Sequence, residues 1–235
     1  MQRVILTLLF LVVTTVFFAQ TSTVKTEILS TQEASELFSE GFNKQLNFIY
    51  PIRTVYKCVG QYQHYYIVLT ASNDSVASKD TLHDNIEAFI LEPGKKRLAV
   101  IWSMKDSTIK QVNSNDVESA IWFWTKYCEF TDIDNDSLID PIFIYGTAGI
   151  NSISDGRIKI LIAYKRQKIA IHHQNGIFDF ERNTKVDKSF YSLPFVVQDH
   201  VKSIMQKMIE DRNAIFPYGW QDAMNNKKLY FDEGQ

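Results

Sequence analysis

The most specific chemical signal in the sequence is an acidic segment, Asp-Ile-Asp-Asn-Asp-Ser-Leu-Ile-Asp, at residues 132–140. Its carboxylates stand at positions 1, 3, 5 and 9 of the segment: Asp132, Asp134, Asp136 and Asp140. Alternate carboxylates in a tight turn can converge on a hard cation, and the main-chain carbonyl of Leu138 would add an uncharged oxygen. Calcium takes about 6–8 oxygen ligands and fits this set better than zinc does. The segment therefore predicts a calcium site made by these four carboxylates and Leu138.

The segment departs from an EF-hand at two positions. Position 6 is Ser137 instead of the turn-forming glycine, and position 12 is Phe143 instead of a bidentate glutamate. A strand-like run, Ile-Phe-Ile-Tyr at residues 142–145, follows where an EF-hand would have a helix. An acidic turn held by Asx hydrogen bonds, with no ion, is the alternative interpretation.

No catalytic motif accompanies the acidic segment. The sequence contains neither G-x-S-x-G nor H-E-x-x-H, and Gly-Thr-Ala-Gly at residues 146–149 lacks the Lys-Ser/Thr of a phosphate loop. The adjacent His172 and His173 would point to opposite faces of a strand, which is a poor arrangement for a shared metal. A non-enzymatic protein is therefore favoured. The competing hypothesis is a glycan-active enzyme, which needs two carboxylates about 5–10 Å apart in a cleft.

The beginning of the chain predicts export. Met-Gln-Arg gives a short positive start, and residues 4–18 form a nearly unbroken apolar run. This is the pattern of a secretory signal peptide, residues 1–19, cleaved after Ala19. The run is shorter than the ~20 residues that a membrane-spanning helix needs. We expect a mature chain of residues 20–235 in the periplasm or at the cell surface, with no membrane span after cleavage.

The two cysteines, Cys58 and Cys128, both stand in segments that look like strands. An oxidising compartment would permit a disulfide between them. Two buried, unpaired thiols that pack as small apolar side chains are the alternative, and the sequence leaves both open.

Composition bounds the class of protein. The chain has 235 residues, of which 45% are hydrophobic and 22% charged, and this excludes disordered and low-complexity classes. Its 25 basic and 27 acidic residues give a net charge of −2, which is too balanced for a nucleic-acid binder that works through a basic field. We expect an envelope protein or a polysaccharide as the partner, and no nucleic acid.

The elements that must position the acidic segment are predicted to be mainly strands. A capping box at residues 30–33 starts a short helix, and residues 46–69 read as two strands joined near Gly60. A hairpin turns at residues 92–95, and several strands follow the acidic segment as a meander. Residues 194–211 form a long helix with one apolar stripe. The predicted fold is a single α+β domain: one antiparallel sheet of six to eight strands, covered on one side by the C-terminal helix.

The acidic segment resembles the Asp-rich calcium loops of FG-GAP and related β-propeller repeats, where such a loop joins two strands. The chain as a whole resembles exported Bacteroidota proteins described as surface polysaccharide biosynthesis proteins. Four segments carry this second resemblance: residues 130–146, 155–160, 168–171 and 214–217. The resemblance implies an envelope location and a link to surface polysaccharide, and it supplies no catalytic residues. Ser137 replaces the glycine that this family has after the third loop aspartate.

Overall fold

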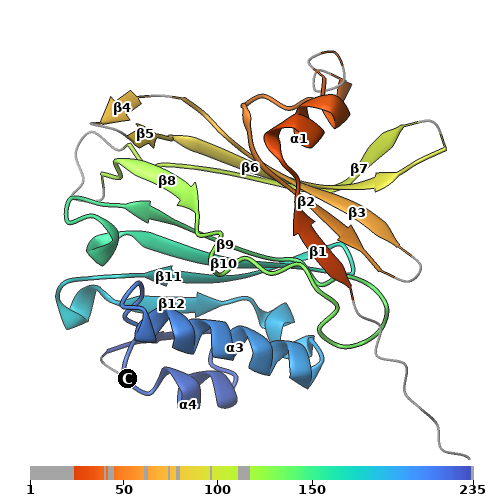
Figure 1. Cartoon of the computed structure of the whole chain (residues 1–235). Helices are drawn as coiled ribbons and strands as arrows, with labels where there is room; N and C mark the ends of the chain where they lie inside the picture. Colours follow the sequence, from red (N-terminus) through yellow and green to blue (C-terminus); the bar gives the residue numbers. More distant parts are fainter. Residues whose placement is uncertain are drawn as a thin grey trace, which may run out of the picture.

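The computed structural model describes residues 24–39, 41, 45–60, 63–73, 75–77, 80–95, 97–110 and 117–233. The predicted signal peptide, residues 1–19, lies outside the described residues. The described chain is mostly β, in two large antiparallel sheets with few helices. In Figure 1, most of the first sheet (orange to yellow-green) lies above most of the second sheet (green to blue), and the C-terminal helices α3 (Phe195–Glu210) and α4 (Trp220–Asn225) lie below the second sheet.

The first sheet comes from the N-terminal half of the chain and has five strands in the order β1-β2-β3-β6-β7. Their bounds are β1 Lys25–Ile28, β2 Ile52–Val59, β3 His64–Ala71, β6 Asn85–Pro93 and β7 Leu98–Ser107. The helix α1, Thr31–Leu37, lies between β1 and β2. A small separate hairpin pairs β4 Ser75–Ala77 with β5 Asp80–Leu82, between β3 and β6.

The second sheet comes from the C-terminal half and has six strands in the order β13-β12-β11-β10-β9-β8. Its strands are β8 Ala120–Phe123, β9 Ile142–Ala148, β10 Arg157–Tyr164, β11 Gln167–Gln174, β12 Asn183–Val186 and β13 Tyr230–Asp232. The helical segments of this half are η1 Ile153–Asp155, η2 Asp179–Glu181, η3 Lys188–Ser192, α3 Phe195–Glu210 and α4 Trp220–Asn225. Because each strand pairs with its neighbour in sequence, the predicted meander is confirmed.

The central strands are apolar at successive positions because both of their faces are covered. In β10, Ile158, Ile160 and Ile162 pack in the core beneath the C-terminal helices, whereas Leu161 and Ala163 pack in the core between the two sheets. Side chains alternate across a strand, so burial on both faces requires an unbroken apolar run. The second sheet is thus an inner layer of the molecule.

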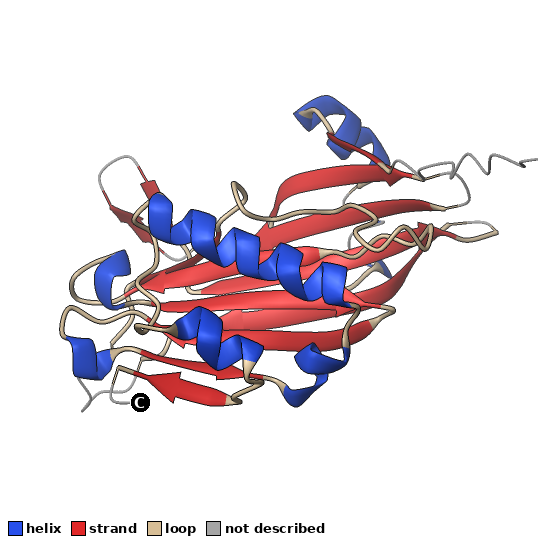
Figure 2. Ribbon diagram, turned by 90° about the horizontal axis from the view of Figure 1, so that it is seen from below, coloured by secondary structure: helices blue, strands red, loops and turns tan. Residues whose placement is uncertain are grey.

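The long helix α3 covers the outer face of the second sheet, as Figure 2 shows from below. Its apolar stripe is buried against the sheet: Val197, Val201, Ile204, Met205 and Met208. These positions recur at the 3.6-residue period of a helix, which is why the sequence predicts this element well. The predicted helix over residues 194–211 is confirmed.

The short helix α1 lies on the outer face of the first sheet. The side chain of Ser30 accepts a hydrogen bond from the main-chain N–H of Glu33, and the Glu33 carboxylate accepts one from the N–H of Ser30. This capping box satisfies two N–H groups that the first turn leaves unpaired. Ala34 and Leu37 pack against a third apolar cluster on the first sheet, and the helix ends at Leu37.

The expectation of a single sheet of six to eight strands under one helix is wrong. The chain forms two sheets, packed face to face across a shared core, and it is mostly β rather than evenly α+β. Periodicity identifies strands, but it does not say which sheet a strand joins. The division falls between β7 and β8, where the sequence is polar.

Both cysteines are free thiols in the core between the sheets, and Cys128 does not lie in a strand. The strand β8 ends at Phe123 and the chain then turns, so Cys128 lies outside the strand that its surrounding sequence suggests. The Cys128 thiol donates to the main-chain oxygen of Ile144 at 3.4 Å. Burial raises the pKa of Cys58 to about 11 and that of Cys128 to about 12, so neither is an activated nucleophile.

Candidate functional site

The acidic loop, residues 132–140, connects the turn after β8 to the start of β9. Its base is closed where the N–H of Asp140 donates to the carbonyl of Thr131 at 2.7 Å and where Glu129 bridges to Ile142. Asn135 and Ser137 have φ values of 58° and 72°, in the left-handed region that favours glycine and asparagine. Ser137 therefore takes a turn conformation that glycine adopts at lower cost.

The loop brings three of its carboxylates together. One oxygen from each of Asp132, Asp134 and Asp136 lies within 4.8 Å of the other two, a spacing at which the three can hold a metal ion. Asp132 is buried at the base of the loop, whereas Asp136 is exposed. Mutual repulsion of three close carboxylates makes the cluster attractive to a cation.

Main-chain N–H groups of the loop also bind these carboxylates. The two oxygens of Asp132 accept from the N–H groups of Asp136 at 3.0 Å and Ser137 at 2.9 Å. Asp136 accepts from the N–H of Leu138 at 2.9 Å. These are the Asx contacts of the ion-free alternative, and they fix the turn before any ion binds.

Two residues at the β10–β11 turn complete the surroundings of the cluster. The hydroxyl of Tyr164 donates to Asp134 at 2.8 Å. The ammonium of Lys165 lies 3.0 Å from a carboxylate oxygen of Asp136. This ion pair raises the pKa of Lys165. The ammonium group already neutralises part of the negative charge that would attract a metal ion.

Asp140, at the end of the acidic loop, has a buried side chain with only one oxygen hydrogen-bonded to the described residues. It is 1% exposed, and one oxygen accepts from the N–H of Ile133 at 3.0 Å. The other oxygen is buried and has no hydrogen-bond partner among the described residues. Burial, together with the charges of Asp134 and Asp136, raises the pKa of Asp140 to about 7. A buried carboxylate oxygen without a partner is costly unless something electropositive approaches it.

The predicted ligand set is thus divided in the structure. Asp132, Asp134 and Asp136 form the cluster, Asp140 is buried close to it, and Leu138 contributes its N–H to Asp136. Every side-chain donor of the set is a hard oxygen, which suits Ca²⁺ or Mg²⁺ rather than a thiolate-seeking metal.

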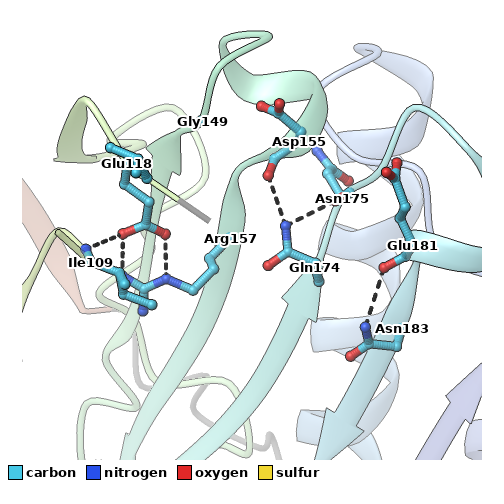
Figure 3. Close-up of a pocket in the computed structure, with 10 residues that line it drawn as sticks. Ile109, Glu118, Gly149, Asp155, Arg157, Gln174, Asn175, Glu181 and Asn183 are labelled. Atoms are coloured by element: carbon cyan, nitrogen blue, oxygen red, sulfur yellow. Dashed lines mark hydrogen bonds and ion pairs between the residues drawn. The ribbon is translucent and has the colours of Figure 1, made fainter. Parts of the chain in front are cut away.

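A second site, which the sequence did not reveal, is a polar cleft of about 490 Å³. It lies where β10, β11 and β12 meet the turns before and after them. We define it by Glu118, Asp155, Arg157, Gln174, Glu181 and Asn183. Figure 3 shows Glu118 and Arg157 on one side of the cleft, with Gln174, Glu181 and Asn183 on the other. A smaller depression of about 270 Å³ shares Arg157, Gln174 and Asn183 and continues to Lys185.

Glu118 is the fully paired carboxylate of the polar cleft. It is 6% exposed and accepts two hydrogen bonds that Arg157 donates from its Nε and Nη2. It also accepts from the N–H of Ile109 and the hydroxyl of Thr147, both at 2.7 Å. With four donors on its two oxygens, Glu118 ties the end of the first sheet to the second and has no role left as a general acid.

Asp155 is hydrogen-bonded through one oxygen, and the neighbouring His173 through both ring nitrogens. One oxygen of Asp155 accepts from the main-chain and side-chain nitrogens of Asn151, both at 2.9 Å, while the other is buried without a partner among the described residues. His173 is buried with both ring nitrogens hydrogen-bonded, and burial lowers its pKa to about 4. His173 pairs with Ile158, which packs in the helix-covered core, whereas half-buried His172 pairs with Lys159, so the adjacent imidazoles belong to opposite faces of the strand.

The polar cleft escapes sequence reasoning because its residues are ordinary polar residues at strand ends, far apart in the chain. Glu118 and Arg157 are separated by 39 positions, and no motif links them. Neither a family model, nor a curated protein, nor a solved structure matches this chain. The site is therefore interpreted from its own geometry.

Proposed function

We propose that this chain is an exported module of the cell envelope that acts by binding, with calcium held in the acidic loop as a structural ion. The observations that carry the proposal are the cluster of Asp132, Asp134 and Asp136 and, in the same loop, the unpartnered buried oxygen of Asp140. A calcium ion would offset the repulsion of these groups and stiffen the connection into β9.

Export is supported by the apolar N-terminal run and by the resemblance to exported envelope proteins. Among the described residues, no helix is long and apolar enough to cross a membrane. The proposed partner is an envelope protein or a surface polysaccharide. The ion is proposed to support the fold, because the cluster stands in the loop that leads into β9.

A glycan-active enzyme is the competing function, and the polar cleft is the observation that favours it, because three carboxylates line one space. Both oxygens of Glu118 are already occupied by strong donors. Asp155 is held by Asn151, and Glu181 accepts from the N–H of Phe178 at 2.9 Å. Carboxylates fixed in this way suit the recognition of a ligand more than proton transfer.

Thermal unfolding in EDTA and in about 10 mM calcium tests the calcium site. A dissociation constant of roughly 10⁻⁴ to 10⁻³ M, expected for a loop without the bidentate glutamate, would stabilise the fold by about 1.4–2.7 kcal/mol. This corresponds to a rise in Tm of about 3–10 °C. Equal melting curves in the two buffers would contradict the proposal.

Two variants of opposite expected effect sharpen this test. Asp136→Asn keeps the acceptor for the Leu138 N–H and removes one ligand charge, so the calcium response should disappear while the protein stays folded. Lys165→Gln removes the cation that competes for Asp136, so calcium should act at a lower concentration. Asp179→Asn, on an exposed side chain in another turn, is the control and should respond like the wild type.

A further inference from the structure

The amide groups of the polar cleft offer hydrogen-bonding atoms that the fold does not use. The side-chain nitrogen of Gln174 donates to the main-chain oxygens of Asp155 at 2.7 Å and Asn175 at 2.9 Å. The nitrogen of Asn183 donates to the main-chain oxygen of Glu181 at 3.2 Å. The two amide oxygens accept no hydrogen bond from the described residues. Gln174 and Asn183 are cross-strand partners, so these oxygens come from adjacent strands.

Two charged residues of the cleft also keep unused groups. One oxygen of Glu181 accepts from the N–H of Phe178, and the other accepts nothing from the described residues. Arg157 uses Nε and Nη2 for Glu118, while its Nη1 is 3.9 Å from the nearest oxygen of Asp106, too far for a hydrogen bond. The cleft therefore presents several acceptors and a donor to a ligand. Hydroxyl groups, which both donate and accept, match this mixture.

The balance of charge narrows the class of ligand. Glu118 and Arg157 neutralise each other, while Asp155 and Glu181 leave the cleft acidic and unfavourable to a polyanion. Lys185, in the adjoining depression, makes a polycation equally unsuitable. A neutral ligand with many hydroxyl groups suits both the polar cleft and the adjoining depression.

The turn that carries Glu181 also carries exposed aromatic surface. Phe178 and Phe180 are 59% and 82% exposed, and their rings stack at 5.5 Å with 5° between the planes. Phe178 precedes η2 and Phe180 lies within it, next to Glu181, which lines the cleft. Arg182 fixes this turn by donating to the carbonyls of Gly176 and Ile177, so the aromatic surface is preorganised. The apolar C–H face of a sugar ring fits such a surface, while its hydroxyls need polar partners.

We propose that the polar cleft and its adjoining depression bind a neutral carbohydrate chain across the ends of β10, β11 and β12. The main cleft alone falls within the ~300–1,000 Å³ typical of small-ligand sites, and the depression extends it along the row of Arg157, Gln174 and Asn183. Such a ligand gives the proposed envelope module, on which this assignment rests, a partner of defined chemistry.

Isothermal titration calorimetry with the mature chain in calcium buffer tests the assignment. The probes are neutral oligosaccharides of glucose, mannose, galactose, xylose and N-acetylglucosamine, with polygalacturonate and heparin as anionic counter-probes. We expect at least one neutral probe to bind and neither anionic probe to do so. Gln174→Ala, Asn183→Ala and Phe180→Ala should each weaken binding at least about fivefold. Gln206→Ala, on α3 at the other face of the sheet, is the matched control and should bind like the wild type.

The result is separable from the fate of the calcium proposal. If calcium raises Tm but no neutral probe binds, the carbohydrate assignment is overturned and the calcium site stands. Binding of only the anionic probes, or unchanged binding by the Gln174 and Asn183 variants at unchanged Tm, would also overturn it. Neutral binding that these variants lose supports it, even if the melting curves show no calcium response.

Discussion

His173 shows at the residue scale how burial couples protonation to stability. Its ring nitrogens lie 2.9 Å from the Thr184 hydroxyl and 2.9 Å from the side-chain oxygen of Asn175. Burial lowers its pKa to about 4, from an ordinary value of 6.5. The neutral imidazole therefore contributes stability that is fully present above the unfolded-state pKa and is lost as the pH falls towards the folded-state pKa.

We expect the wild type to lose about 2 kcal/mol of stability relative to His173→Gln between about pH 7 and pH 5. Urea unfolding of both proteins at each pH measures this difference. His200 is the control of opposite sign, because hydrogen bonding to Glu129 raises its pKa. The advantage of the wild type over His200→Gln should therefore grow as the pH falls. A His173 difference that stays constant with pH would show that its imidazole is not held neutral.

The acidic loop is predictable at this scale and the polar cleft is not. Asp132, Asp134 and Asp136 converge because alternate positions of one tight turn meet, so their spacing in sequence carries their geometry. The burial of Asp140 depends on how the loop packs, which spacing alone does not encode. Glu118 and Arg157 meet only because β10 passes the end of β7, and that contact is a product of the whole fold.

At the scale of elements, Gly156, between η1 and β10, marks the point where this segment closely approaches the main chain of β9. A Cβ atom at this position would lie 1.9 Å from the main-chain oxygen of Thr147, which cannot move without disturbing β9. Gly156→Ala should destabilise the protein by about 2–3 kcal/mol through overpacking. Urea unfolding measures the loss.

Gly60→Ala provides the matched glycine control, because its new Cβ would meet Val24 at an ordinary 3.5 Å. This variant should change the free energy of unfolding by less than about 1 kcal/mol. If Gly156→Ala lost as little free energy of unfolding as Gly60→Ala, the approach of β9 and β10 would be looser than the geometry indicates.

Local signals predict the elements well, and tertiary pairing decides the rest. The capping box of α1, the apolar stripe of α3 and the hairpin of β6 and β7 are each encoded within a few residues. The short strand β12 has no such signal, because three of its four residues are polar. The three-residue strand β13 pairs with β12 only after α3 and α4 return the chain to the sheet edge.

At the scale of the whole molecule, we expect the protein isolated from its source organism to begin at or near Gln20. The apolar run of residues 4–18 is long enough for a signal peptide and too short to anchor the chain. Mass spectrometry of the intact protein identifies the terminus. An intact Met1 in membrane fractions would contradict the prediction.

The division of the chain into two sheets sets an order of events during synthesis. Most neighbouring strands in each sheet follow one another closely in the chain, so most pairings can form as hairpins with low loop-closure entropy, while β1 and β13 join from farther along the chain. The first sheet, however, covers its inner face only when the second supplies Phe143, Leu161 and their neighbours. Until residue 163 or so has emerged, Ile67 and Leu69 remain uncovered on a preformed sheet. The nascent first half is thus the stage at which aggregation competes with folding, and holdase chaperones would act there.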